Sequence, residues 1–386
     1  TLTFSDAVTA TTIANYGTLL FNATSAKTIS PAITDNGDTT IQVINNNNDT
    51  ISLITFSGSV AADTITVGSS AKAGSALFNG AVSGTNISII GGDGTSSAEN
   101  SQATFANTVT VTAISLDNNT STATVTFSGA TKTIIGTING AAAGEGTIIV
   151  SGTPTFTGII GGTQRPAQLT INGATTFQAA VSTTLLTTTA AISNGTTLNV
   201  SGASSIGANI STTGDQTYTG AVTLTASPTL TSPTGTILFS STVDGGYTLT
   251  ITNSASTGDV TFASAVGGTT SLTGLTITTD ILTAAAIRST GTLSVTNTGT
   301  SSITGIISEN VSALAVTKAG TGTLTLSGAN SYTGATTVSA GTLAISNATG
   351  LGTTASGTTV ADGAALELSG GITIGAEALT LNGTGI

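Results

Sequence analysis

Short runs of alternating polar and apolar residues fill most of the chain. Thr108–Thr112, Ala123–Phe127 and Thr321–Leu326 each alternate over five or six positions, and Gly, Asn or Asp separates such runs. Alternation with a period of two, bounded by turn residues, is typical of half-buried β-strands. Apolar residues at helical spacing are rare, and the nearest example, Leu282–Ile287, is too short for a helix. The pattern therefore predicts an all-β fold built from short strands.

Aromatic residues mark a repeat within this pattern. In most cases an aliphatic residue follows an aromatic one four positions later, with small residues between them, as at Phe78 and Val82. We interpret each pair as an inward aromatic side chain that ends one strand and an inward aliphatic side chain that begins the next. Phe21 and Phe127 lack the aliphatic partner. The residues expected as core marks are Phe4, Phe56, Phe78, Phe105, Phe156, Phe177, Tyr218, Phe239 and Phe262.

The aromatic residues recur at a nearly constant spacing. From Phe56 to Phe262, with Phe127 included, successive distances are 22, 27, 22, 29, 21, 41, 21 and 23 residues, and 41 is close to two periods. Such a period is the signature of repeat architectures in which each unit buries its apolar face against its neighbours. A rung of about 22 residues accommodates three short strands and three turns. We therefore predict a single-stranded parallel β-helix, or β-solenoid, with the core marks lying above one another.

The amino-acid composition agrees with this fold and excludes several kinds of function. Of 386 residues, only 6 are Lys or Arg and 17 are Asp or Glu, whereas 49 are Gly and 88 are Thr. A mean hydropathy of +0.38 argues against a disordered chain. Because His and Cys are absent, Ser-His-Asp and Cys-His nucleophile systems and zinc, haem or iron–sulfur sites with those ligands are excluded. We expect no catalytic residue, no cofactor and no metal site.

The distribution of charge also limits the partners. The formal net charge is −11, and no basic patch is evident, so we expect no binding to nucleic acid. No uninterrupted apolar run approaches the ~18 residues that a transmembrane helix needs, so we expect no transmembrane segment in this chain. The six basic residues are scattered along the sequence at Lys27, Lys72, Lys132, Arg165, Arg288 and Lys318.

The C-terminal fifth of the chain resembles a known family. Leu314–Gly334, with Thr336–Val338 and Gly341–Leu343, closely resembles the autotransporter-associated β-strand repeat, and a similar sequence pattern continues to about Ile386. Gln216–Leu224 and the residues after it are similar to repeats in filamentous-haemagglutinin-like surface proteins. The resemblance implies a right-handed β-helical passenger domain, exported across a Gram-negative outer membrane and displayed outside the cell. We expect irregular solenoid rungs over 1–313 and the repeat region, continuous with them, over 314–386.

Three pairs of carboxylates are candidates for glycoside cleavage, a reaction that uses two such groups. Each pair lies in or beside a turn-rich stretch, where Asp commonly caps the backbone or faces water, so we favour a structural role. The pairs are Asp35 with Asp38, Asp244 with Asp259, and Glu367 with Glu377.

Two other features have a functional and a structural interpretation. Gly91–Gly94 includes Asp93 and matches one copy of a calcium-binding glycine-rich repeat, but without further copies we favour a corner or a loop. Tyrosine side chains can form platforms for carbohydrates, but we favour packing in the core or at corners, with the hydroxyl group at the surface. The four tyrosines are Tyr16, Tyr218, Tyr247 and Tyr332.

Taken together, these features predict a non-enzymatic extracellular surface protein, a β-helical stalk, fibre or adhesin. Both ends of the chain lie within the strand pattern, and open ends of a β-helix invite pairing with another strand. We therefore expect end-to-end association, either with further rungs of one precursor or with a second copy in a filament. Two alternatives stay open: a β-helical enzyme that acts on polysaccharide, and an adhesive module specific for a glycan or cell-surface ligand.

Overall fold

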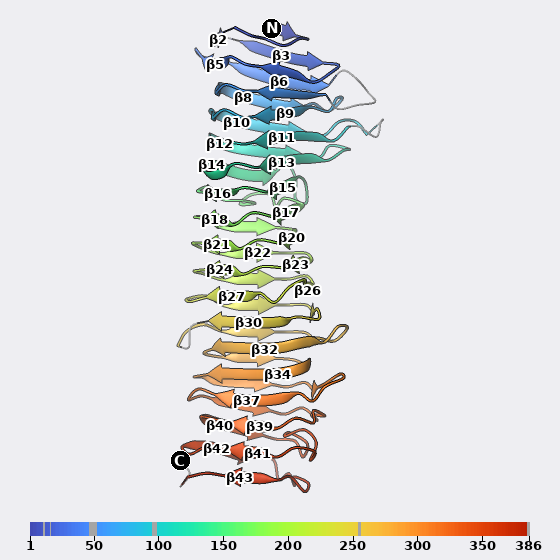
Figure 1. The fold of residues 1–386 in the computed structure, drawn as a ribbon, viewed down its shortest axis with the longest axis vertical. Helices are drawn as coiled ribbons and strands as arrows, with labels where there is room; N and C mark the ends of the chain where they lie inside the picture. Colours follow the sequence, from blue (N-terminus) through green and yellow to red (C-terminus); the bar gives the residue numbers. More distant parts are fainter. Residues whose placement is uncertain (11, 16, 46–51, 95–98, 254–255, 384–386) are drawn as a thin grey trace. The chain divides into compact units, whose positions relative to one another are not determined.

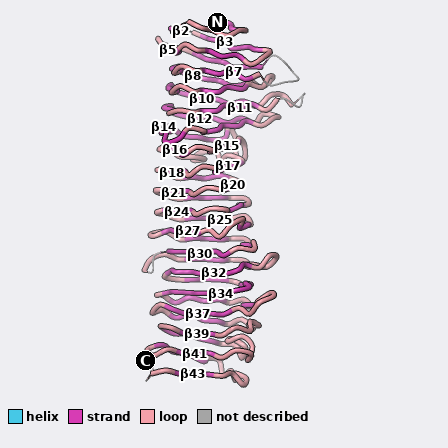
Figure 2. Tube along the Cα trace, viewed as in Figure 1, coloured by secondary structure: helices cyan, strands magenta, loops and turns pink. Residues whose placement is uncertain are grey.

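A computed structural model of the chain describes residues 1–383 except 11, 16, 46–51, 95–98 and 254–255. The described residues form strands, turns and loops, and no helix occurs among them (Figure 2). They belong to two compact units, Thr1–Gly195 and Thr196–Ile386, called unit 1 and unit 2 below. The predicted all-β parallel β-solenoid is confirmed, with about 16 turns of roughly 22 residues each. The boundary expected at residue 313 lies inside unit 2 and stays a prediction.

Unit 1 has three faces, each a row of parallel strands from successive turns (Figure 1). Strands β8, β10, β12 and β14 bend around a corner, so their first residues belong to face C and their last residues to face A. Face A contains β1 (Leu2–Phe4), β3 (Thr18–Ala23), β6 (Thr40–Asn45), β8 (Val60–Gly68), β10 (Val82–Ile90), β12 (Val109–Asp117), β14 (Ala130–Gly140) and β19 (Val181–Thr183). Face B contains β4 (Lys27–Ile29), β7 (Leu53–Phe56), β9 (Ser75–Phe78), β11 (Ser101–Phe105), β13 (Ala123–Phe127), β15 (Thr147–Val150), β17 (Gln168–Ile171) and β20 (Leu185–Thr188). Face C also contains β2 (Thr12–Asn15), β5 (Ala32–Asp35), β16 (Thr153–Phe156), β18 (Thr175–Phe177) and β21 (Ile192–Asn194).

Unit 2 also has three faces of parallel strands, named D, E and F. Face D contains β22 (Leu198–Val200), β25 (Gln216–Tyr218), β28 (Ile237–Phe239), β31 (Val260–Phe262), β33 (Leu282–Ala284), β35 (Thr300–Ile303), β38 (Thr323–Leu326), β40 (Gly341–Ile345) and β42 (Ala364–Leu368). Face E contains β23 (Ser204–Ile206), β26 (Val222–Leu224), β29 (Val243–Asp244), the start of β34 and β36 (Ile307–Ser308). Face F contains β24 (Ile210–Thr212), β27 (Thr229–Ser232), β30 (Thr248–Asn253), β32 (Leu272–Thr279), the rest of β34 (Ile287–Asn297), β37 (Ala315–Ala319), β39 (Thr336–Val338), β41 (Thr358–Val360) and β43 (Leu379–Leu381).

The sequence forms these strands because successive side chains of a β-strand point to opposite faces. In β31, Val260 and Phe262 are buried, whereas the intervening Thr261 is partly exposed. β-Branched residues suit such a half-buried pleated surface. The parallel register places Phe262 beside Phe239 of the preceding turn, so inward residues of equal type lie above one another.

Corners between strands depend on glycine at specific positions. Gly320 follows β37 with a φ of +75°, a conformation that residues with a Cβ atom rarely adopt. A Cβ atom at this position would collide with the backbone carbonyl oxygen of Asn297 one turn away. The close approach of successive turns therefore requires glycine at Gly320.

Candidate functional site

The aromatic residues of unit 1 form a continuous series of ring contacts in its core, called the aromatic stack below. All except Phe4, which is half-buried, are at most 1% exposed. Centroids of neighbouring rings are 4.8 to 5.8 Å apart across the protein's aromatic contacts, within the range of favourable aromatic pairs. The successive neighbours are Phe4, Phe21, Phe56, Phe78, Phe105, Phe127, Phe156 and Phe177.

The aromatic stack changes face twice. Phe21 on face A contacts Phe56 on face B edge to face, and Phe127 on face B contacts Phe156 on face C edge to face. The expectation that the core marks lie above one another is therefore correct only within each face.

Phe21 and Phe127 belong to this stack although they lack the aliphatic partner four residues later. Phe21 lies inside β3, which continues to Ala23, so no corner follows it directly. Phe127 ends β13, but β14 begins with exposed residues and its first buried aliphatic side chain is Ile134. The aromatic contacts therefore continue past corners of different length. The expected aliphatic residue four positions after each aromatic residue is not needed for them.

A shorter aromatic stack lies in unit 2. Tyr218, Phe239 and Phe262 occupy equivalent positions on β25, β28 and β31 of face D. Their ring centroids are 5.1 and 4.8 Å apart, and the ring planes deviate from parallel by 10° and 4°. All three side chains are at most 1% exposed, so they pack in the core and cannot contact a ligand directly.

One member of each candidate carboxylate pair accepts hydrogen bonds from nearby structural groups. Asp35 Oδ1 lies 2.8 Å from the Gly37 amide nitrogen, and this hydrogen bond is the main cause that lowers the pKa of Asp35. Asp244 Oδ1 accepts hydrogen bonds from the amides of Thr269 and Thr270 at 2.8 and 3.0 Å. Asp35 thus fixes the loop that follows its own strand, and Asp244 connects two turns of the solenoid.

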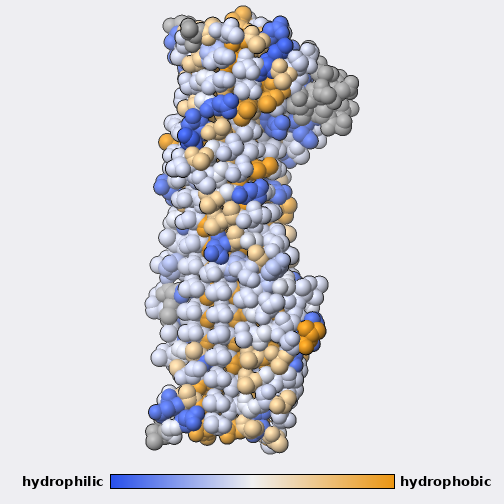
Figure 3. Space-filling model, in the orientation of Figure 1, coloured by the Kyte–Doolittle hydropathy of each residue, from blue (hydrophilic) through white to orange (hydrophobic). Residues whose placement is uncertain are grey.

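The structure places the other members of the pairs in loops and on a strand. Asp259 is partly exposed and lies directly before β31. Asp38 has a φ of 55° in a turn, and Glu367 is exposed on β42. Glu377 accepts a hydrogen bond of 2.8 Å from the hydroxyl of Thr358. Figure 3 shows the strongly hydrophilic residues of the visible face as small separate groups. Among the described residues, no group of three or more His, Cys, Asp or Glu side chains could hold a metal ion.

The glycine-rich segment around Asp93 contributes to a loop between turns. The carbonyl oxygen of Gly92 accepts hydrogen bonds from the side chains of Asn119 at 3.1 Å and Thr120 at 2.8 Å. Gly94 has a φ of +75°. Because the Gly92 carbonyl already has side-chain donors, these contacts favour the interpretation of the segment as a structural loop.

The tyrosines differ from the expectation that their hydroxyl groups reach the surface. Tyr218 and Tyr332 are fully buried, and their hydroxyls bond to Gln216 Oε1 at 2.9 Å and Thr336 Oγ1 at 2.7 Å. Burial raises the pKa of Tyr218, and it raises the pKa of Tyr332 to about 12. Of the other two, Tyr247 is 41% exposed and Tyr16 lies outside the described residues.

A buried lysine is the ionisable group that sequence reasoning missed. Lys318 on β37 has an exposed fraction of 0%, although lysine is rarely fully buried in proteins. Its Nζ atom donates hydrogen bonds to the carbonyl oxygens of Ala319, Gly320 and Ala340 at 2.7, 2.8 and 3.2 Å. Burial lowers the pKa of Lys318 to about 8. The ammonium group thus binds the carbonyl groups of a corner in two successive turns.

Other buried polar side chains act in the same way at the corners of unit 2. Asn297 Nδ2 donates to the carbonyl oxygens of Gly299 at 2.7 Å and Thr323 at 2.9 Å. Asn253 Nδ2 donates to the carbonyl oxygen of Gly235 at 2.9 Å. The sequence signal for such a contact is a Thr or Asn two residues before a Gly whose carbonyl oxygen it binds, as at Thr212 and Asn297. These contacts satisfy carbonyl groups that the strand pairing leaves free.

A carboxylate holds the loop that precedes the repeat region. Glu309 accepts hydrogen bonds from the Leu314 amide at 2.7 Å and from the Thr333 amide and hydroxyl at 2.9 and 2.6 Å. Desolvation raises the pKa of Glu309, but these hydrogen bonds, with that of the Thr333 hydroxyl the strongest, lower it by more. Glu309 therefore stays ionised and ties one turn to the next.

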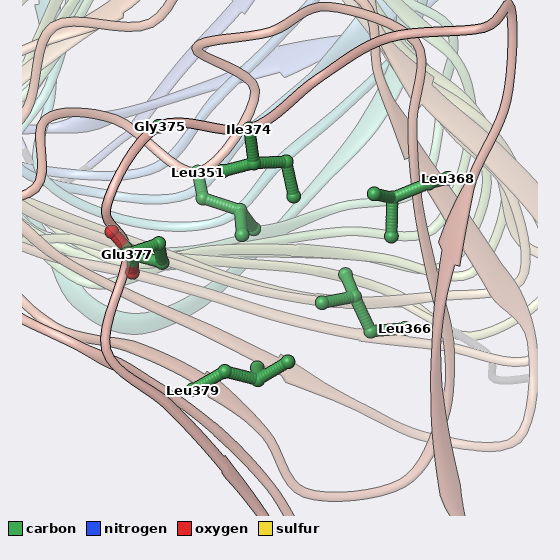
Figure 4. Close-up of a pocket in the computed structure, with 7 residues that line it drawn as sticks. All are labelled: Leu351, Leu366, Leu368, Ile374, Gly375, Glu377 and Leu379. Atoms are coloured by element: carbon green, nitrogen blue, oxygen red, sulfur yellow. The ribbon is translucent and has the colours of Figure 1, made fainter.

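An apolar pocket lies beside the last strands of unit 2. Its volume is about 150 Å³, and leucine side chains of several segments point into it, with Glu377 at one side (Figure 4). Leu368 and Leu379, which line it, are 49% and 48% exposed, and Leu381 on β43 is 66% exposed. The residues that line the pocket are Leu351, Leu366, Leu368, Ile374, Gly375, Glu377 and Leu379. Its chemistry suits an apolar side chain or strand edge.

Comparison with known proteins identifies one repeat in the chain. The family model of the passenger-associated-transport-repeat matches residues 316–345, which include β37–β40 and the buried Lys318. This match and the β-solenoid fold fit an autotransporter passenger domain. The resemblance of Gln216–Leu224 to filamentous-haemagglutinin-like repeats stays a prediction. No curated protein and no solved structure matches the chain.

Proposed function

We propose that the chain is a non-enzymatic extracellular structural protein of a Gram-negative bacterium, in which a β-solenoid acts as a stalk, fibre or adhesin. The passenger-associated-transport-repeat at 316–345, set within a parallel β-solenoid, is the observation that carries this proposal. In such repeat architectures each turn contacts only its neighbours, which suits a structural role. In the part of the chain that the structure describes, no helix is long and apolar enough to cross a membrane.

The contacts of the carboxylates support a structural role over an enzymatic one. Asp35, Asp244 and Glu377 each accept a hydrogen bond from the chain's own amide or hydroxyl groups. A glycosidase instead needs two carboxylates that face each other across a sugar-binding groove. Incubation of the purified chain with bacterial and host polysaccharides should release no reducing ends. Release that is lost in the Asp244→Asn variant would support the enzyme alternative.

Cell fractionation tests the proposed location. Intact cells of the source bacterium should lose the chain when an added broad-specificity protease acts from outside, while a periplasmic marker stays intact. Recovery of the chain only from lysed cells would contradict an extracellular role. Binding of the purified chain to immobilised glycans or host cells would assign the adhesin role over that of a passive stalk.

We also propose that solenoid ends associate with a further strand, from the same precursor or from a second copy. β43 pairs with β41, and its residues Leu379 and Leu381 present exposed apolar side chains beside the apolar pocket. Unpaired strand edges of this kind template the addition of another strand. Leu2 on β1 is 54% exposed and offers an apolar surface for such an edge.

Sedimentation velocity over a wide range of concentrations tests the self-association. We expect oligomers that the double variant Leu379→Lys and Leu381→Lys no longer forms. The matched control places lysine at Ile135 and Ile159, exposed apolar residues of unit 1, and should leave association unchanged. A monomer at every concentration would exclude the second copy as the partner.

A further inference from the structure

Face F of unit 2 carries two neighbouring rows of hydroxyl side chains that point away from the core. β27, β30 and β32 each contribute two threonines at alternate positions, and β34 contributes a serine and a threonine. The parallel register aligns the first row as Thr229, Thr250, Thr276 and Ser294, and the second row as Thr231, Thr252, Thr278 and Thr296. These eight residues are called the hydroxyl array below.

The hydroxyl array is a regular two-dimensional lattice. Neighbouring strands are ~4.8 Å apart, and alternate residues along a strand are ~6.7 Å apart. The first row continues beyond the array through Thr317, Thr337, Thr359 and Thr380. Figure 3, in the orientation of Figure 1, shows pale residues in regular columns at the level of these strands. The array therefore repeats with one spacing along the strands and another across them.

The array hydroxyls are free to bind a partner outside the protein. Within the described residues, none of the eight side chains makes a hydrogen bond to another protein group, and none of them is charged. Other threonines of the chain differ, since Thr137 and Thr157 donate their hydroxyls to the carbonyl oxygens of Thr112 and Ile134. In the array such free hydroxyl groups form two parallel rows over four successive strands.

The array is held rigid from below. The inward neighbours of the central threonines, Leu249, Ile251, Leu275 and Ile277, are all 0% exposed. β-Branched side chains in a strand have few χ1 rotamers, so the hydroxyl and methyl groups of Thr keep fixed positions. Binding to a rigid, preorganised surface costs little conformational entropy.

We propose that the hydroxyl array is an ice-binding surface. The prism face of hexagonal ice repeats with nearly the same two spacings as strands and alternate residues in a β-sheet. Threonine suits this ligand because its hydroxyl joins the hydrogen-bonded lattice while its methyl group occupies the space between water molecules. Because the array carries no charge, it also does not order water molecules in a geometry that differs from that of ice. The proposal goes beyond the role as an extracellular shaft and does not depend on it.

The test is the growth of single ice crystals in solutions of the full chain. The wild type should bind to growing ice, shape the crystal and lower its freezing point below its melting point. The double variant Thr250→Tyr and Thr276→Tyr should lose these activities, because bulky rings interrupt the first row. Thr276→Val, which keeps the shape of the side chain and removes only its hydroxyl, should weaken them.

A matched control separates the array from the rest of the surface. Thr261 and Thr283 are register neighbours on face D, where β31 and β33 each present a single outward residue, so no second row lies beside them. Thr261→Tyr with Thr283→Tyr should keep the wild-type activity on ice. The proposal is overturned if the wild type is excluded from growing ice, or if array and control variants lose activity equally while circular dichroism shows both folded. Binding to crystalline cellulose or chitin without any effect on ice would also overturn it.

Discussion

Lys318 Nζ donates a hydrogen bond of 3.2 Å to the carbonyl oxygen of Ala340, one turn further along unit 2. A buried ammonium group is costly unless hydrogen bonds replace the lost water. Here three carbonyl oxygens at one corner replace it, within the segment that matches the passenger-associated-transport-repeat. The lysine thus links successive turns where a strand ladder cannot.

The ionisation of Lys318 should make stability depend on pH. Its pKa is about 8 in the folded chain and 10.5 in the unfolded chain, so between these values the unfolded chain binds more protons. The free energy of unfolding should therefore rise as the pH increases from about 8 towards 10. The difference between wild type and Lys318→Met, followed by urea denaturation across this range, isolates the contribution. A difference that stays constant with pH would contradict the buried state of Lys318.

Loss of one ring from the aromatic stack should destabilise unit 1 strongly. Phe78 lies between Phe56 and Phe105, with ring centroids 4.9 and 5.0 Å away. Phe78→Ala should lower the free energy of unfolding by about 3–5 kcal/mol. The adjacent residue Leu77 points away from the core, so Leu77→Ala should have a much smaller effect. Equal effects of the two substitutions in urea denaturation would be incompatible with the observed strand orientation.

The solenoid could be predicted from the sequence because the spacing of aromatic residues stays recognisable even where the corners differ in length. Alternation and recurring aromatic residues were enough to place Phe56, Phe78 and Phe105 on equivalent strands. Corner length is set by contacts between turns. The expected spacing of four residues between an aromatic and an aliphatic residue therefore did not identify Phe21 and Phe127 as core residues.

Tyr218 and Tyr332 were predicted to pack in the core or at corners, but their hydroxyls are buried because Gln216 and Thr336, two and four residues away, bond to them. The burial of Lys318 depends in part on the carbonyl oxygen of Ala340 one turn away, which the sequence alone does not show. The alignment of the hydroxyl array likewise required the register.

The buried hydroxyl of Tyr218 should contribute measurably to stability. Tyr218→Phe removes the donor that Gln216 Oε1 uses in the core, where no water can replace it. An unsatisfied buried acceptor costs about 1–3 kcal/mol. The control Tyr247→Phe alters an exposed ring and should change the melting temperature little. A Tyr218→Phe variant as stable as the wild type would indicate that the Gln216 contact is not made.

Two glycines with similar backbone conformations should respond differently to alanine. Gly320 and Gly363 have φ angles of +75° and +74°, so alanine is strained at both positions. Only at Gly320 would the new Cβ atom collide with another turn, at the Asn297 carbonyl oxygen, whereas open space surrounds Gly363. Gly320→Ala should therefore lower the melting temperature clearly more than Gly363→Ala. The reverse order would contradict the close approach of turns at this corner.

Distances between spin labels along face F test the stacking of turns most directly. The chain has no Cys, so pairs of cysteines can be introduced cleanly at Thr250 with Thr337, Thr250 with Thr359, and Thr229 with Thr359. The register places these pairs four, five and six turns apart. Pulsed dipolar spectroscopy should give distances of ~19, ~24 and ~29 Å, which grow by one strand spacing per turn. Distances that fail to increase in this order would contradict the β-solenoid and the accounts of function that rest on it.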